Sequence, residues 1–184
     1  SKGDVKAAVL MVEFPNYTPV ITKEAVGRTM FGSNNSLRSY YKTSSYGMLN
    51  ISGDVYDWYK APNNREYYED NTREYPPAEM LLREVIAAKD EEVDFSKYDS
   101  NNDGYVDAVY LITSGNDTGF SSMWWAYMKP FIDDIVVDGK KINRFVLMPE
   151  TQVNYLIAAH ETGHLMGLQD YYDTEKNFWG GSSY

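Results

Sequence analysis

The sequence contains no cysteine. This absence excludes disulfide bonds and thiolate metal sites, and it leaves the redox state of the compartment open. Histidine is almost as rare, because the chain has 2 histidines among 184 residues. Any metal site with imidazole ligands must therefore use one or both of these side chains.

Long hydrophobic runs and positive charge are also scarce. The longest apolar run, residues 7–12, is far too short to cross a bilayer. Lys and Arg number 17 against 27 Asp and Glu, so the formal net charge is −10, and we expect no nucleic-acid partner. A hydrophobic fraction of 43% and 17 tyrosines exclude a disordered chain. We therefore expect a soluble monomer with one domain over residues 1–184.

Hydrophobic periodicity predicts a mixture of strands and helices. Strands are expected at residues 5–14, 48–59, 105–113 and 123–128. Gly53 is a candidate bulge or hairpin point in the second of them. Asp138 and Gly139 separate two β-rich runs and predict a hairpin over residues 133–148. Helices are expected at residues 23–30, 37–43, 76–92 and 153–165.

Both histidines occur in the stretch "HETGHLMGLQD", residues 160–170. Residues i and i+4 share one face of an α-helix, so His160 and His164 can direct imidazole nitrogens to a single point. Glu161 lies about 100° around the helix from His160, where it can approach a metal-bound water without entering the coordination shell. The alternative is an ordinary pair of surface histidines, and the continuation of the pattern argues against it.

The residues after His164 extend this pattern to a third ligand. Gly167 has no β-carbon and can turn the chain sharply out of the helix, which lets the Asp170 carboxylate return towards the metal. Two nitrogens, one oxygen and an open fourth position are typical of catalytic zinc, although other divalent metals bind such ligands too. Zinc lowers the pKa of its water towards about 7, and Glu161 would act as the general base in peptide hydrolysis.

A second candidate metal site is the acidic stretch "DSNNDGYVD", residues 99–107, whose spacing is similar to the start of an EF-hand loop. The candidate calcium ligands are the side chains of Asp99, Asn101, Asp103 and Asp107 and the backbone carbonyl of Tyr105. Tyr110 occupies the place of the bidentate glutamate, so the loop is not an EF-hand. The alternative is an Asx-rich turn that leads into a strand.

A few other side chains are candidates for a functional role. Trp124 and Trp125 could line a substrate cleft, but packing is the favoured interpretation. Asp173 could bind a second metal, or it could be a solvated loop acid. Ser182 and Ser183 have no histidine left to activate them, which disfavours a serine hydrolase.

The histidine motif matches the pattern His-Glu-x-x-His-x-x-Gly-x-x-Asp, and the chain resembles the immune inhibitor A family of secreted bacterial metallopeptidases. The segments "VKAAVLMVEFPN", "SYYKTSSYGMLNISGDVYDWY" and "DFSKYDSNNDGYVDAVYLI" carry the resemblance over most of the chain. The resemblance implies an α+β, zincin-like (metzincin-like) fold: a twisted mixed sheet, a backing helix at residues 77–92 and an active-site helix. It also implies that His160, His164 and Asp170 bind zinc, with Glu161 as the base, and it favours calcium in the acidic loop.

The expected function is that of a secreted zinc endopeptidase that cleaves extracellular proteins. In this family the chain continues past the third ligand through a methionine-containing turn into the lower wall of the cleft. The present sequence ends at Tyr184, so we expect mainly the upper subdomain, with the lower subdomain truncated. A non-catalytic metal-binding module is the rival hypothesis, and Glu161 beside an open coordination position favours the enzyme.

Overall fold

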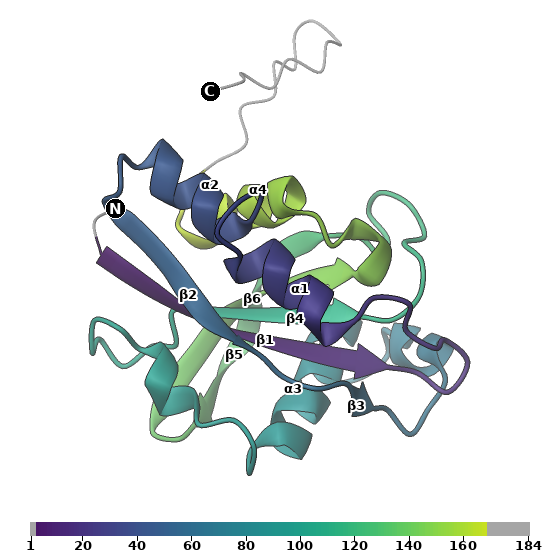
Figure 1. Cartoon of the computed structure of the whole chain (residues 1–184). Helices are drawn as coiled ribbons and strands as arrows, with labels where there is room; N and C mark the ends of the chain where they lie inside the picture. Colours follow the sequence, from purple (N-terminus) through teal and green to yellow (C-terminus); the bar gives the residue numbers. More distant parts are fainter. Residues whose placement is uncertain (1–2, 169–184) are drawn as a thin grey trace, which may run out of the picture.

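The longest apolar run of the sequence forms the central strand of the structure. The computed structural model describes residues 3–168, and β1 (Gly3–Glu13) lies between β2 (Leu49–Val55) and β4 (Ala108–Thr113). Both neighbours run parallel to β1. Side chains 7–12 are fully buried, because helices cover both faces of the sheet (Figure 1). The predicted central strand is confirmed.

The sheet has six strands within the described residues, and it is mixed. Its order is β2-β1-β4-β6-β5, and β3 (Tyr59–Lys60) pairs with the end of β1. β6 (Lys140–Pro149) runs parallel to β4, whereas β5 (Tyr127–Val137) is antiparallel to β6 and forms an edge. The turn between β5 and β6 has positive φ angles at Asp138 (50°) and Gly139 (71°), as the predicted hairpin requires.

Helices pack on both faces of this sheet (Figure 1). α1 (Lys23–Phe31), α2 (Leu37–Ser44) and α4 (Tyr155–Leu165) lie on one face, and α3 (Pro77–Lys89) lies on the other. Short 3-10 helices complete these elements: η1 (Arg65–Glu69), η2 (Phe95–Tyr98) and η3 (Glu150–Gln152). The sheet therefore separates α4 from α3.

Alternate side chains of β1 enter two separate hydrophobic cores. Leu10 and Val12 pack in the core that includes α3, whereas Val9 and Met11 pack in the core that includes α1, α2 and α4. This division follows from the two-residue period of a strand, which points successive side chains to opposite faces. The predicted mixed sheet with helices is thus confirmed, and the helix expected at residues 76–92 covers the face opposite α4.

The four predicted helices are all present. Ser36 caps α2, and its side chain and that of Ser39 form a reciprocal capping box. The largest difference in bounds is at the end of α3, which stops at Lys89. α4 begins at Tyr155 because Asn154 serves as its N-cap.

The prediction of a bulge or hairpin at Gly53 is wrong. β2 pairs with β1 in continuous register through Gly53, opposite Ala7. A β-carbon on Gly53 would lie 2.0 Å from the carbonyl oxygen of Ala7 and 2.8 Å from Cζ of Phe31. The glycine thus permits a close approach of backbone and helix side chain inside a regular strand. β2 ends at Val55, so residues 48–59 are not one bent strand.

Two further strand predictions need correction. No separate strand covers residues 123–128, because β5 begins at Tyr127 and continues through a register shift between Pro130 and Ile135. Proline cannot donate to the ladder, which accounts for the irregularity at this edge. The strand expected from residue 105 begins at Ala108, and Tyr105 makes an isolated bridge to Lys141.

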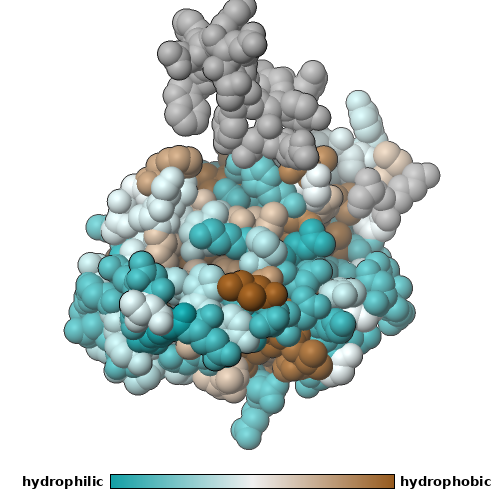
Figure 2. Space-filling model, turned by 180° about the vertical axis from the view of Figure 1, so that it is seen from behind, coloured by the Kyte–Doolittle hydropathy of each residue, from teal (hydrophilic) through white to brown (hydrophobic). Residues whose placement is uncertain are grey.

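The surface agrees with the polar composition of the chain. The face seen in Figure 2 is mostly hydrophilic, with small separate hydrophobic areas. Among the helices of residues 3–168, none is long and apolar enough to cross a membrane.

Candidate metal centre

Helix α4 carries both histidines, and its local sequence fixes where it starts and which side it buries. The Asn154 side chain accepts a hydrogen bond from the Leu156 amide at 2.8 Å, which caps the first turn. Ala158 and Thr162 are fully buried against the sheet, and such small side chains let the helix approach closely. His160, by contrast, is exposed. The helix thus turns the first histidine away from the core.

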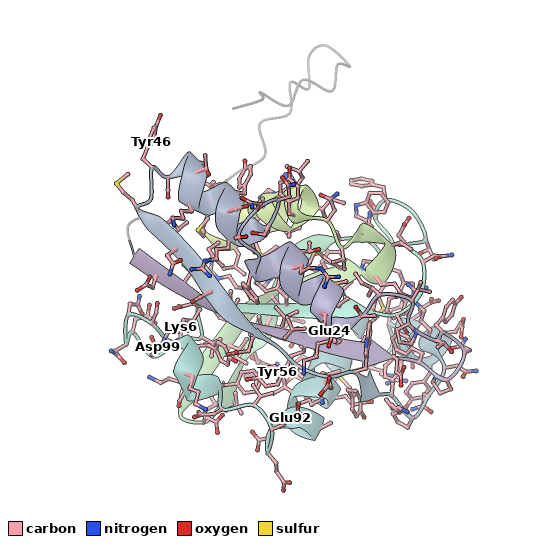
Figure 3. The ribbon with its side chains drawn as sticks, viewed as in Figure 1. Lys6, Glu24, Tyr46, Tyr56, Glu92 and Asp99 are labelled. Carbon is pink, nitrogen blue, oxygen red and sulfur yellow. The ribbon has the colours of Figure 1, made fainter. Side chains whose placement is uncertain are left out.

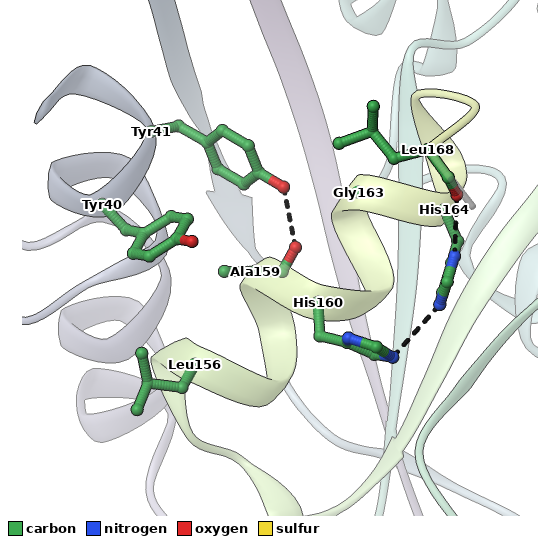
Figure 4. Close-up of a pocket in the computed structure, with 8 residues that line it drawn as sticks. All are labelled: Tyr40, Tyr41, Leu156, Ala159, His160, Gly163, His164 and Leu168. Carbon is green, nitrogen blue, oxygen red and sulfur yellow. Dashed lines mark hydrogen bonds between the residues drawn. The ribbon is translucent and has the colours of Figure 1, made fainter. Parts of the chain in front are cut away.

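The two imidazoles face one another (Figure 4). Nε2 of His160 and Nε2 of His164 lie 3.1 Å apart, and the ring planes meet at 86°. Two nitrogens that each lie about 2.0–2.1 Å from a tetrahedral zinc are about 3.3 Å apart. The spacing of the two Nε2 atoms therefore fits two ligand positions of one metal ion.

Gly167 ends the helix in a Schellman turn. Its φ of +90° lies in the left-handed region, where a residue without a β-carbon is unstrained. The Gly167 amide donates to the His164 carbonyl at 2.9 Å, and the Leu168 amide donates to the Gly163 carbonyl at 2.9 Å. These two bonds define the motif. The predicted stop at Gly167 is confirmed.

The same turn orients the second histidine. It brings the Leu168 carbonyl oxygen to 2.9 Å from Nδ1 of His164 (Figure 4). A carbonyl only accepts hydrogen bonds, so Nδ1 carries the proton and donates. Nε2 of a neutral His164 then keeps its lone pair, as a metal ligand must. The histidine motif does not include this carbonyl, although Gly167 in the sequence indicates a Schellman turn that would bring it there.

Glu161 follows the first histidine directly and is 7% exposed. Its position in α4 is about 100° of helix rotation from His160. A general base has to lie next to the reacting water and be shielded from bulk solvent. Both the adjacency and the burial of Glu161 agree with that task, and its role remains a prediction.

The predicted third ligand, Asp170, lies outside the described residues. Within residues 3–168, no three side chains of the types His, Asp, Glu and Cys gather as a metal site. The part of the chain that the structure describes therefore supplies two convergent imidazoles with Glu161 beside them. The ligand set as a whole stays a prediction.

A pocket of about 250 Å³ lies beside the histidines, between α2 and α4 (Figure 4). Its lining residues are Tyr40, Tyr41, Leu156, Ala159, His160, Gly163, His164 and Leu168. Most of these side chains are apolar or aromatic. The histidines thus border a hollow with largely apolar walls.

The acidic loop has a different arrangement. The side chain of Asp99 is completely buried and accepts hydrogen bonds from the amides of Asp103 (3.1 Å) and Gly104 (3.0 Å). Nζ of Lys140 donates to the same carboxylate at 2.6 Å. This bond with the lysine holds the pKa of Asp99 below its usual range.

The other predicted calcium ligands also bond within the loop and its surroundings. Asn101 Oδ1 accepts from the Asp103 amide at 3.1 Å, and Asp103 Oδ1 accepts from the Tyr105 amide at 2.9 Å. Asp107 accepts from the amide of Lys6 at 2.8 Å, which ties the loop to β1. Figure 3 labels Lys6 of β1 and Asp99 of the loop. These contacts are those of an Asx-rich turn whose Asp99 carboxylate is paired with the Lys140 ammonium. Calcium in this loop stays a prediction.

Trp124 is a packing residue, as expected. It is 2% exposed, its ring meets Phe14 edge-on at 5.4 Å, and its Nε1 donates to Glu69 at 2.6 Å. Trp125 is half-buried, and its ring lies 6.1 Å from that of Phe120. Asp173, Ser182 and Ser183 lie outside the described residues.

Comparison with known proteins identifies the family. A family model described as the catalytic domain of the immune inhibitor A peptidase M6 matches residues 22–183. This chain belongs to that family. The resemblance carried by the histidine motif is thus confirmed, and membership of a metallopeptidase family implies a metal.

The chain is also similar, at low sequence identity, to two curated proteins. It is 26% identical over 175 residues to the pre-pro-metalloprotease PrtV of Vibrio cholerae serotype O1. This alignment covers 76% of the present chain and 19% of PrtV. It is 25% identical over 236 aligned positions to immune inhibitor A of Bacillus thuringiensis subsp. alesti. This alignment covers 94% of the present chain and 34% of that protein. The chain thus spans a minor part of each relative.

Proposed function

We propose that this chain provides the metal centre of a zinc-dependent endopeptidase that hydrolyses peptide bonds in extracellular proteins. The observation that carries the proposal is the convergence of the two Nε2 atoms at 3.1 Å, with His164 oriented by the Leu168 carbonyl. The names of the bacterial relatives, a metalloprotease and immune inhibitor A, support it. Secretion is part of the same proposal.

Each residue has one task in this reaction. His160, His164 and Asp170 would hold the metal. Zinc, when bound, supplies a Lewis acid that lowers the pKa of the attacking water and polarises the scissile carbonyl. Glu161 takes a proton from that water and passes it to the leaving amine, so that one carboxylate serves as base and then as acid.

The described residues fit the upper subdomain of a zincin-like, metzincin-like catalytic domain. In this assignment α4 is the active-site helix, and α3 supports the sheet from its opposite face. The lower wall of the substrate cleft would be formed by polypeptide that follows Leu168. We expect protein or peptide substrates and a monomeric enzyme.

Calcium is a secondary part of the proposal. The loop of residues 99–107 presents oxygen atoms of the kind that calcium prefers. The ammonium of Lys140 lies against Asp99, so a calcium ion in the loop would have to displace it. Calcium would therefore bind weakly and add stability rather than chemistry.

The rival function is a metal-binding module without turnover. It shares the two imidazoles but has no use for a shielded carboxylate next to the first histidine, so Glu161 separates the two hypotheses.

Metal analysis combined with casein cleavage tests the proposal. The assay compares the 184-residue chain and a longer polypeptide with their Glu161→Gln variants, because glutamine keeps the shape of glutamate and cannot accept the proton. We expect one zinc per chain in every protein and cleavage by the longer wild-type protein only. If that protein binds zinc and cuts no faster than its glutamine variant, the peptidase function is wrong and the module stands.

A further inference from the structure

Helix α4 is attached to the rest of the molecule by side chains from distant parts of the sequence. Three hydrogen bonds reach it from α2, β4 and β6, and each is 2.7 Å long. They join Tyr41 Oη to the Ala159 carbonyl, Tyr110 Oη to Thr162 Oγ1, and Arg144 Nη1 to the Leu165 carbonyl. The helix positions that they hold, 159, 162 and 165, recur at every third residue.

These three positions lie on the side of α4 opposite the histidines. At about 100° of rotation per residue, their mean direction is about 180° from the mean direction of positions 160 and 164. The bonds therefore fix the rotation and height of the helix on the sheet, and Tyr41 also lines the pocket that the imidazoles border. Any roll or slide of α4 on the sheet would move both Nε2 atoms.

Tyr41 holds the residue just before the first histidine. Its side chain reaches from α2 across the boundary of the two helices, and its hydroxyl donates to the Ala159 carbonyl (Figure 4). The residue is 8% exposed, and burial raises the pKa of its phenol, so the proton that makes this bond stays in place.

Arg144 holds the residue just after the second histidine. The Leu165 carbonyl belongs to the last turn of α4, where carbonyls have no partner inside the helix and carry the negative end of its dipole. The guanidinium of Arg144 gives this carbonyl both a hydrogen bond and a positive charge. Arg144 lies on β6, a strand inside the sheet.

We propose that Tyr41 and Arg144 are positioning residues of the metal centre. Together they fix the backbone on both sides of the histidine pair through their hydrogen bonds to the Ala159 and Leu165 carbonyls. Ligand sites lose affinity when their donors are misplaced by about 0.5 Å, so two anchors at the ends of the pair would matter. The inference rests on the proposed function, because it assumes that His160 and His164 bind zinc.

The first test measures the zinc Kd of the 184-residue chain by competition with a chromophoric chelator. Tyr41→Phe removes one hydrogen bond and keeps the ring. Tyr40→Phe is the matched control, because no hydrogen bond joins the Tyr40 hydroxyl to α4 among the contacts of residues 3–168 (Figure 4). We expect zinc binding to weaken about tenfold in Tyr41→Phe, the lower end of the range for residues that orient ligands, and to be unchanged in Tyr40→Phe.

The second test uses Arg144. Arg144→Met should weaken zinc binding to a similar extent, and Arg144→Lys should restore part of it, since lysine keeps a cationic donor. The visible absorption of the cobalt-loaded chain gives a readout of ligand geometry, and we expect it to change in Tyr41→Phe and Arg144→Met but not in Tyr40→Phe.

A purely structural role would give a different pattern. Both anchor variants would then melt at lower temperature, while their zinc Kd and cobalt spectrum, measured well below the melting temperature, would equal those of the wild type. That result would overturn the inference and leave the proposed function intact. A wild-type chain that binds no zinc would overturn both, and this baseline is measured first.

Discussion

The end of helix α4 and the acidic loop both match metal-binding patterns, yet they use their donor atoms in opposite ways. At α4 the two Nε2 atoms turn towards each other, and the proton of His164 Nδ1 is bound by a backbone carbonyl. In the loop the carboxylate of Asp99 accepts hydrogen bonds from two backbone amides and from Lys140. A pattern of ligand types therefore indicates a site best when other groups orient the donors towards one point.

The largest effect that would separate the two regions comes from the turn after α4. Gly167→Ala puts a β-carbon on a residue with φ +90°, at a cost of about 1–2 kcal/mol, and displaces the Leu168 carbonyl from His164. We expect the zinc Kd to rise about tenfold.

Gly139→Ala is the matched control for this change. Gly139 also has a positive φ (71°), and a β-carbon added to either glycine would meet no atom of the described residues within 4 Å, so the backbone strain is similar. Titration with zinc should show no change of affinity in Gly139→Ala. Equal affinities in the two variants would mean that the Leu168 carbonyl does not orient His164.

The next largest effect concerns Lys140, whose ammonium group is hydrogen-bonded to Asp99 in the acidic loop. Lys140→Gln removes the ammonium from Asp99 and leaves the negative charge of the loop without its partner. Added calcium should then stabilise the variant more than the wild type, by about 2–4 °C in Tm for each 1 kcal/mol gained. Thermal melts measure this stabilisation at about 1 mM calcium, a concentration close to the Kd of weak extracellular calcium sites.

Lys141→Gln is the control for the loop variant, because Lys141 is an exposed neighbour that pairs with Asp134 at 4.0 Å. Its response to calcium should equal that of the wild type. If added calcium stabilises neither Lys140→Gln nor the wild type, the loop is an Asx-rich turn and no calcium site.

The smallest effect is a pH dependence. Because Lys140 lowers the pKa of Asp99 in the folded state, the ionised carboxylate stabilises the fold above its unfolded pKa of about 3.9, and this stability is lost as the pH falls through the lower folded value. The stabilities of wild type and Asp99→Asn, measured by urea unfolding, should differ at pH 7, and the difference should shrink as the pH falls below about 3.9. A difference that stays constant with pH would show that the charge of Asp99 is unimportant.

Much of the metal centre could be read from a short window of sequence. The i, i+4 spacing of the histidines and the stop at Gly167 depend on backbone geometry within a few residues, and the structure has the helix and the turn where they indicate. Strand predictions were less accurate, because Gly53 reflects a contact with β1 and Phe31 that no local pattern contains.

Sequence by itself determined the helices, the central buried strand, the histidine pair and the family, since these depend on local periodicity and on a continuous motif. Tertiary structure alone decided which groups hold that motif. The Tyr41 bond to α4 spans 118 positions, and the Lys140 bond to Asp99 spans 41. Such contacts exist only after the sheet brings distant segments together, so the spacing of residues along the chain carries no record of them.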